Sequence, residues 1–548
     1  MPSGLLRAIS LLIFAALLQA CNSGSGVSQD APSSALGQVT APVNTPMTRY
    51  AAARAADQVS FGATPALVDA ISTTGLEVWI NSQMALPLQP VVSPSWVTNY
   101  SMSDKPAEMQ AYWFPQQEFF RRATTVPDQL RMRVAWALMQ FIPVNGKVQP
   151  YGMMEHFNLL QKHAFGNYAN LLKELTTSAA MGHFLDNAQN RPVSSQCPSC
   201  APNENYAREL MQLFALGVVK LNADGSTVRD AAGKPVETYT QEDVEELAGA
   251  LTGWRFAPSA TRLPDSNWAN FGLPMEPETW SGAHDFRAKT ILGVSFPAGR
   301  DARQELDAAV ALMMNHQNIA PFVSLRMIQH LVTSNPSPQY IARMSAVFRN
   351  NGKGVAGDMA ALVKAILLDP EARLGDRPGA DTSRFGKLRE PVLWYTGLLR
   401  GLGCTRALQQ GNWRVSPPEQ TPFNPPSVFS FYLPTDRAPR SNLLAPEQKL
   451  ISTNELTWRL GMNFPLLNDD GPTPHNCDYA TLGRLYAQST SALIDEIGAR
   501  WFRGAVPASL RMVLEQQATT FWRGMSNDEA AVRLTVYALT SPFYGVMR

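Results

Sequence analysis

The chain has 548 residues, of which 45% are apolar, 17% are charged and 9% are aromatic. This length and apolar content allow one large domain or a few ordinary ones with a buried core. The low charged fraction excludes a solvated, disordered protein. Lys and Arg total 46 against 45 Asp and Glu, so the chain as a whole has no general electrostatic attraction for nucleic acid or anionic lipid, and we expect no nucleic-acid partner.

The first twenty residues have the pattern of a secretory signal peptide. Arg7 supplies the positive charge, and the apolar stretch from Ala8 to Leu18 follows it. Eleven helical residues span roughly 16 Å, which is too short for a bilayer core of about 30 Å. The segment ends in Leu18-Gln19-Ala20-Cys21, which resembles the bacterial lipobox. We therefore expect residues 1–20 to be removed and Cys21 to be lipidated; the alternative is ordinary cleavage beside a chance cysteine.

Residues 21–48 predict a flexible tether that connects the lipid to the folded part. They are rich in Ser, Gly, Pro and Ala, a composition that cannot bury a core. Asn22 follows the cysteine, and in lipoproteins of two-membraned bacteria this resembles the outer-membrane default. We therefore expect a cell-envelope protein that is held on a membrane through its lipidated N-terminus. The signal at Asn22 indicates the outer membrane.

Residues 49–548 predict a single large, mainly α domain, with two lobes meeting near 370–390 as an alternative division. Apolar residues recur at helical spacing over 127–141. Over 240–254 the helical pattern begins with a capping box formed by Thr240 and Asp243. The same patterns predict further helices at 302–316, 318–334, 337–351, 354–369, 443–461, 479–503, 508–523 and 527–540.

Strand signals are scarce in the sequence. A small β-ribbon is expected near 217–240, where short β-forming runs flank Asp224-Gly225 and Ala232-Gly233 turns. Two long Pro-rich connections, 255–300 and 405–442, exceed ordinary loop lengths, and loops of this length are usually functional or packed over a site.

Four cysteines remain once Cys21 is assigned to the lipid. An even number in an oxidising compartment favours two disulfides, Cys197–Cys200 and Cys404–Cys477. The Cys197-Pro-Ser-Cys200 motif has two alternatives, a redox dithiol or half of a zinc site. It lies in a Pro- and Ser-rich loop without the strand, helix or further ligands that those sites use, so we expect no metal.

The most polar stretch of the sequence surrounds the beginning of a predicted helix. Asn203 can cap a helix that runs from Glu204 to about Leu216. Asp186, Asn187, Asn190 and Asn205 are expected near the same helix end, and such groups are costly to bury unless they satisfy one another or a ligand. The simpler alternative is a capped surface helix with an ion pair between Glu204 and Arg208.

A second polar stretch contains His284 and Asp285, in the long 255–300 connection. A histidine there suits proton transfer, although a structural hydrogen bond is the more common role. His156 and His163, by contrast, are expected to be packed core residues. No nucleophile elbow, zinc-protease, phosphate-loop or dinucleotide motif is present, so that no motif requires a cofactor. The Asn222–Ser226 stretch predicts a hairpin turn rather than a calcium loop.

Several motifs resemble the bacterial family known as domain of unknown function 1800. They are Phe61–Thr64, Ala164–Asn167, Glu204–Leu210, Tyr239–Asp243, Leu251–Trp254, His284–Gly293, Pro425–Phe429 and Ala445–Glu447. The resemblance implies an exported, mainly helical bacterial protein. Many members have a His-rich stretch near Trp136–Phe141, where this chain has Ala137-Leu138-Met139-Gln140. Members often occur beside an exported family that looks like sulfatases or phosphatases, which implies a partner of that kind.

Two functions fit these patterns. The first is a hydrolase of an envelope or extracellular polymer, in which carboxylates act as acid, base or nucleophile. Its catalytic candidates are Glu204, Glu209, Asp186 and His284, and its substrate-binding candidates are Asn205, Arg208, Asn203 and Asp285. Trp254 and Trp268 are candidates for stacking on sugar rings. The second is a non-catalytic lipoprotein that holds an exported partner or polymer, in which the same groups form a structural network.

Overall fold

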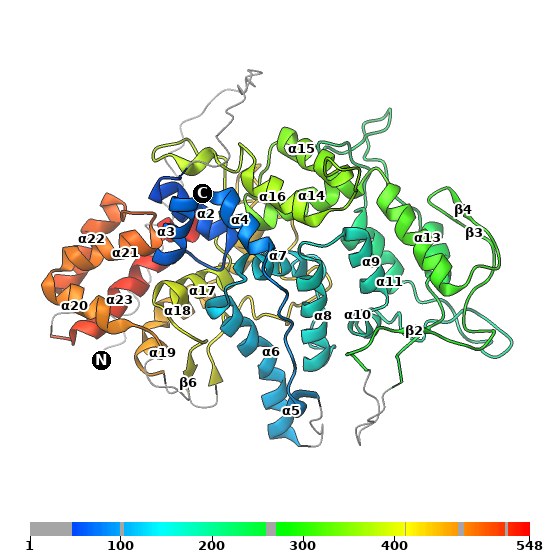
Figure 1. Cartoon of the computed structure of the whole chain (residues 1–548), viewed down its shortest axis with the longest axis horizontal. Helices are drawn as coiled ribbons and strands as arrows, with labels where there is room; N and C mark the ends of the chain where they lie inside the picture. Colours follow the sequence, from blue (N-terminus) through cyan, green and yellow to red (C-terminus); the bar gives the residue numbers. More distant parts are fainter. Residues whose placement is uncertain (1–45, 99–103, 259–269, 411–412, 470–475, 521–523) are drawn as a thin grey trace.

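The structure, a computed structural model, describes residues 46–98, 104–258, 270–410, 413–469, 476–520 and 524–548. Helices dominate these residues, which confirms the mainly α class (Figure 1). The first half contains α2 (Arg49–Val59), α3 (Pro65–Thr74), α4 (Leu76–Met84), α5 (Ser95–Thr98), α6 (Lys105–Thr125), α7 (Gln129–Met139), α8 (Pro150–His163), α9 (Tyr168–Thr176), α10 (Ala179–Phe184), α11 (Asn205–Glu209), the π-helical turn η1 (Leu210–Ala215) and α12 (Gln241–Ala250).

The second half is helical in the same way. It contains α13 (Ala302–Asn315), α14 (Ile319–Leu331), α15 (Pro338–Arg349), α16 (Met359–Leu368), the 3₁₀ turn η2 (Leu374–Asp376), α17 (Pro391–Gly401), the 3₁₀ turn η3 (Pro446–Leu450), α18 (Thr453–Gly461), α19 (Asn463–Leu467), α20 (Tyr479–Gln488), α21 (Thr490–Trp501), α22 (Ala508–Thr520), α23 (Asn527–Thr540) and α24 (Pro542–Gly545). In Figure 1, α20–α23 lie at one end of the molecule and α9–α13 at the other.

Most predicted helices are confirmed with slightly shorter bounds, because their caps mark where they begin. The capping box of Thr240 and Asp243 forms at the start of α12. Two predictions were wrong in detail. The segment 443–461 is a 3₁₀ turn followed by α18, and 479–503 is broken at Ser489, whose hydroxyl accepts a hydrogen bond from the Ala492 N–H and begins α21.

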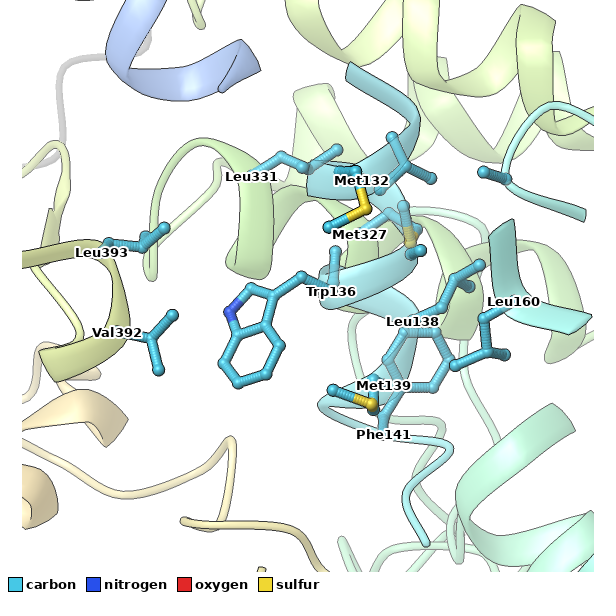
Figure 2. Close-up of a cluster of buried hydrophobic side chains, with 14 of the residues drawn as sticks. Met132, Trp136, Leu138, Met139, Phe141, Leu160, Met327, Leu331, Val392 and Leu393 are labelled. Atoms are coloured by element: carbon cyan, nitrogen blue, oxygen red, sulfur yellow. The ribbon is translucent and has the colours of Figure 1, made fainter. Parts of the chain in front are cut away.

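The core is one continuous cluster of buried apolar side chains that extends from Ala52 to Met547. At its centre α7 is buried on every side, as is α17, so that neither has the solvated face of an ordinary surface helix. Figure 2 shows Trp136 of α7 directed toward Val392 and Leu393 of α17.

Strands form only short antiparallel pairs within the described residues. These are β1 (Trp254–Arg255) with β2 (Glu276–Pro277), β3 (Lys289–Ile291) with β4 (Val294–Phe296), β5 (Lys387–Leu388) with β8 (Val546–Met547), and β6 (Gln409–Gln410) with β7 (Trp413–Arg414). The ribbon expected near 217–240 is present as three isolated bridges, Val219–Glu237, Leu221–Thr227 and Arg229–Pro235. The predicted turn at Asn222–Ser226 closes with a hydrogen bond from the Asn222 N–H to the Ser226 carbonyl, 2.8 Å.

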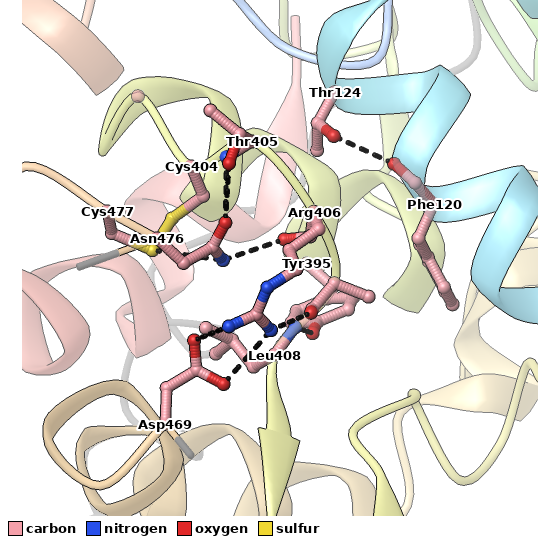
Figure 3. The surroundings of a disulfide bond; sticks show 12 residues. Phe120, Thr124, Tyr395, Cys404, Thr405, Arg406, Leu408, Asp469, Asn476 and Cys477 are labelled. Carbon is pink, nitrogen blue, oxygen red and sulfur yellow. Dashed lines mark hydrogen bonds and ion pairs between the residues drawn. A yellow bond between two sulfur atoms is a disulfide. The ribbon is translucent and has the colours of Figure 1, made fainter. Parts of the chain in front are cut away.

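Both predicted disulfides are present, Cys197–Cys200 and Cys404–Cys477. The second joins the residues after α17 to those before α20. Around it, Asn476 accepts a hydrogen bond from the Thr405 hydroxyl and donates one to the Arg406 carbonyl, and Arg406 pairs with Asp469 at 2.8 Å (Figure 3). No helix in the described part of the chain is long and apolar enough to span a membrane.

Candidate functional site

The predicted helix at Asn203 forms, but in two halves. Asn203 Oδ1 accepts a hydrogen bond from the Asn205 N–H, 2.9 Å, and α11 follows. Asn190 fixes this start, because its amide donates to the Asn203 carbonyl and its Oδ1 accepts from the Asn203 N–H. The helix then continues as the π-helical turn η1. Such turns are rare and are frequent at functional sites.

Asp186 is an exposed residue beside this helix start, and it has a left-handed backbone conformation with φ of 57°. Its carboxylate pairs with Lys147 Nζ at 2.7 Å and accepts a hydrogen bond from the Asn205 amide at 3.3 Å. Asn187, the next residue, is buried, and neither atom of its amide has a partner within the described residues. Asp186 and Asn205 therefore do meet, as the sequence predicted.

Glu204 is held in a different set of contacts. Its carboxylate pairs with Arg208 at 2.6 Å and accepts a hydrogen bond from the Gln241 amide at 2.8 Å. Arg208 also donates to the Gln241 side-chain oxygen, 3.1 Å. All three side chains are partly exposed. An exposed pair of this spacing stabilises a helix by only about 0.3–0.5 kcal/mol.

Glu209 is the one predicted acid with an incomplete set of partners. Its Oε2 is buried and has no hydrogen-bond partner in the described part of the chain. Burial raises the pKa of this carboxyl, while the nearby Arg208 opposes the rise. Tyr239 and Gln212 lie on the same side of the helix, joined by a hydrogen bond of 3.4 Å.

His284 belongs to a buried network between α12 and α13. Its Nδ1 lies 2.9 Å from the Thr252 carbonyl, and its Nε2 lies 3.5 Å from Glu305 Oε2. Glu305 pairs with Lys289 at 3.0 Å, and both side chains are fully buried. Burial lowers the pKa of His284. Burial also raises the pKa of Glu305 to about 7, although Lys289 opposes that rise.

Asp285 completes this network on its other side. Its carboxylate forms a two-pronged pair with Arg287, at 3.0 and 2.7 Å. Burial opposes the ionisation of Asp285, but the hydrogen bonds from Arg287 outweigh it and lower the pKa of the carboxyl. The network packs tightly on α12, because a Cβ added at Gly249 would lie 2.9 Å from the Asp285 carboxylate. These contacts are those of a structural junction.

The eight predicted site residues therefore fall into separate sets. Among the described residues, no hydrogen bond or ion pair joins His284 or Asp285 to Glu204, Glu209 or Asp186. Trp254 is only 1% exposed, so the expectation that it stacks on sugars was wrong; it fills the core instead. Trp268 lies outside the described residues.

A pocket lies where the other end of the predicted helix meets the core. Its wall consists of Gln140, Phe141, Gln212, Leu213, Phe322, Arg326, His330, Val428, Phe429, Tyr432 and Pro434. The helix therefore reaches a pocket through η1, which supplies Gln212 and Leu213, and the long 405–442 connection supplies the last four residues. None of the four predicted catalytic residues lines it.

Buried charges lie behind this pocket. Glu390 pairs with Lys387 at 2.7 Å and accepts hydrogen bonds from Gln420 and Trp136, at 2.9 and 3.3 Å. Burial opposes the ionisation of Glu390, but Lys387 and Arg133 outweigh it and lower its pKa to about 2. Glu447 lies 3.3 Å from Lys387, and burial raises its pKa.

Sequence reasoning missed this pocket, although one signal was available. The helix predicted over 127–141 places Arg133 among apolar residues such as Met132 and Val134, and in the structure, where the helix is buried on every side, this arginine is fully buried. A charged residue in a helix with no solvated side must find partners inside the protein. The partners come from residues 330–447, and no local pattern connects them with α7.

Comparison with known proteins places the chain in one family. The family model described as Protein of unknown function (DUF1800) matches residues 54–546. No curated protein and no solved structure matches the chain significantly. Within the described residues, no group of three or more His, Cys, Asp or Glu side chains is arranged to hold a metal ion.

Proposed function

The chain belongs to the DUF1800 family of proteins of unknown function, and from its own geometry we propose that it is a non-catalytic binding lipoprotein of the cell envelope. One observation carries this proposal. Asp186, Glu204 and His284 are each engaged by different partners, respectively Lys147, Arg208 and the Thr252–Glu305 network. An acid–base mechanism needs two such groups within reach of the same substrate atoms.

The anchor in this proposal is Cys21. The chain has five cysteines, and the other four form disulfides, which leaves Cys21 for other chemistry. Disulfides are typical of oxidising compartments outside the cytosol. More than one acyl chain on a single cysteine gives stable membrane attachment. The lipobox-like sequence and Asn22 support attachment to the outer membrane.

Membrane fractionation with mass spectrometry tests the anchor. We expect the native chain to sediment with membranes and to carry acyl mass on Cys21. The Cys21→Ser variant should lose both and appear in the soluble fraction, because one residue supplies the whole attachment. A Cys21→Ser variant that keeps its acyl mass and its membrane attachment would refute lipidation there.

The binding surface in this proposal is the exposed polar surface around the start of α11, defined by Asp186, Asn203, Glu204, Asn205 and Arg208. It presents charges of both signs together with the exposed side chains of Asn203 and Asn205. The partner is an envelope polymer or an exported protein of the sulfatase-like or phosphatase-like kind. Polar surfaces of this composition suit hydroxyl- and amide-rich partners, because hydrogen bonds rather than apolar burial supply specificity there.

Co-sedimentation with insoluble envelope polysaccharide tests this surface. The full chain should pellet with the polysaccharide, and Arg208→Gln should weaken the binding severalfold. Arg511→Gln is the matched control, because Arg511 of α22 also pairs with a carboxylate four residues away, Glu515, at 3.5 Å. The helix α22 lies at the other end of the molecule from α11 (Figure 1). Equal binding by both variants would remove this surface from the proposal.

One observation favours the second candidate, a carboxylate-based hydrolase. Glu209 has a raised pKa and an unpartnered buried oxygen, which are properties of a general acid. If the chain is a hydrolase that uses Glu209, the Glu209→Gln variant should lose turnover while its melting temperature changes by only a few degrees.

A further inference from the structure

The pocket described above has room for more than water. Its volume is about 50 Å³, whereas a single water needs roughly 10–15 Å³. Most of its wall is apolar, including Phe141, Leu213 and Phe322, and its polar members include Arg326 and His330. A wall of this kind suits a small group with a few polar atoms and an adjoining apolar part.

The charges in and behind the pocket do not balance. Arg133, Arg326, Lys387 and the carboxylate of Glu390 lie around His330, and Glu447 adds a second carboxylate beside Lys387. The neighbouring Arg389 is paired with Asp57 at 2.8 Å and adds no net charge. Three cations against two carboxylates leave one formal positive charge, and a charge that is withdrawn from water without a partner is costly.

Arg326 is a half-buried cation that lacks a carboxylate partner in the described part of the chain, as does the fully buried Arg133. Its guanidinium donates to the Gln329 side-chain oxygen at 2.9 Å and lies over the Phe322 ring at 5.1 Å from its centre. Burial alone lowers its pKa to about 10, with no acidic group raising it. Because Arg326 lines the pocket, a bound anion would reach it directly.

Unused hydrogen-bonding groups surround the same place. His330 is buried, lines the pocket and has no partner for its Nδ1 among the described residues. Arg133 is fully buried, and its Nε and one terminal nitrogen also lack partners there. Buried polar atoms are nearly always paired, so several unpaired ones beside one pocket indicate a missing ligand.

We propose that this pocket binds the carboxylate of a small organic monoanion, with Arg326 as its ionic partner and the His330 Nδ1–H as a donor. A single negative charge completes the balance of the buried groups. The apolar wall then holds the carbon atoms next to the carboxylate. A dianion such as phosphate would leave an excess negative charge and would place polar oxygens against aromatic rings. This site does not depend on lipidation or on polymer binding at α11.

Thermal denaturation of the full chain in detergent, at constant sodium chloride concentration, tests the proposal. The probe is sodium propionate, with propionamide as its uncharged analogue and inorganic phosphate as the dianion. A ligand that binds only the folded state raises the melting temperature as its concentration rises. We expect a saturable rise with propionate, and no saturable rise with propionamide or phosphate.

Variants locate the effect. Arg326→Gln should raise the apparent Kd for propionate at least about tenfold, whereas Arg303→Gln, which removes an arginine from α13 outside the pocket wall, should leave it unchanged. Leu213→Phe keeps every charge but fills the pocket, so it should abolish the rise in melting temperature with propionate. This variant replaces Arg326→Gln as the test if Arg326→Gln does not fold. The proposal is overturned if propionate gives no saturable rise, if propionamide or phosphate matches it, or if Leu213→Phe responds like the native chain.

Discussion

Glu305 is a residue whose chemistry depends strongly on its surroundings. It is fully buried between Lys289 and His284, and burial raises its pKa from 4.5 to about 7. A carboxyl with a raised folded-state pKa stabilises the fold while it is protonated in both states, below about pH 4.5. This contribution is lost as the pH rises from there to about 7.

The pH dependence of unfolding tests this assignment. Relative to Glu305→Gln, which is neutral at every pH, the native chain should lose on the order of 2 kcal/mol of unfolding free energy between pH 4.5 and 7. His284 titrates in both proteins, so its opposite contribution largely cancels in the difference. Chemical denaturation of both proteins across this pH range measures the difference in unfolding free energy. Parallel curves of unfolding free energy against pH would show that Glu305 does not titrate there.

At the same scale, the sequence identified some site residues correctly and could not place others. Asn203 accepts a hydrogen bond from the Asn205 N–H just before α11, and Asp186 meets Asn205, because these contacts lie within about twenty residues along the chain, although the residue in the capping position is Glu204. His284 was grouped with them, but its partner Glu305 belongs to α13. Contacts of that kind depend on how distant elements pack, which local spacing does not determine.

Among the elements, α17 is packed closely against its neighbours. It is buried along its whole length, and a Cβ added at Gly401 would lie 2.3 Å from the Trp501 ring of α21. Such a distance requires the Trp501 ring to shift from its place. The packing of these two helices therefore depends on the missing side chain at Gly401.

A pair of glycine substitutions tests this packing. Gly401→Ala should lower the unfolding free energy by about 1–3 kcal/mol, because it overfills a packed interface. Gly461, also the last residue of its helix, has open space where its Cβ would be, so Gly461→Ala should be neutral or stabilise by up to about 1 kcal/mol. A similar loss of stability in both variants would show that a general helix-end effect, not contact with Trp501, is responsible.

The sequence predicted the elements better than their interruptions. The capping box at Thr240 fixed the start of α12 from four residues alone. The break at Ser489 was missed because both sides of it follow a helical pattern, although a serine is more favourable at a helix N-terminus than inside a helix. The π-helical turn η1 likewise has no signal in spacing, since it results from packing against α13 and α14.

For the whole molecule, long-range links hold the two ends together. The C-terminal strand β8 pairs with β5, and Arg54 of α2 donates to the carbonyl of the last residue at 2.5 Å, where the C-terminus lies beside α2 (Figure 1). The disulfide Cys404–Cys477 adds a covalent link across 73 residues. The sequence predicted this pairing from the number of cysteines but not where it lies in the fold.

The two disulfides should contribute unequally to stability. Closing the longer loop restricts the unfolded chain more, so replacing Cys404 and Cys477 by alanine should cost about 4 kcal/mol, against about 2 kcal/mol for Cys197 and Cys200. Denaturant unfolding of the two double variants measures the difference. A larger loss from the pair at 197 and 200 would mean that local loop structure, rather than chain restriction, dominates.

We propose that this chain binds an envelope partner without turning it over. The most direct measurement follows both properties in one sample: insoluble envelope polysaccharide is incubated with the full chain, and the bound protein and the soluble sugar fragments are quantified. We predict bound protein and no fragment release above background, for the native chain and for Glu209→Gln alike. Fragment release by the native chain that disappears in Glu209→Gln would contradict the account and establish a hydrolase.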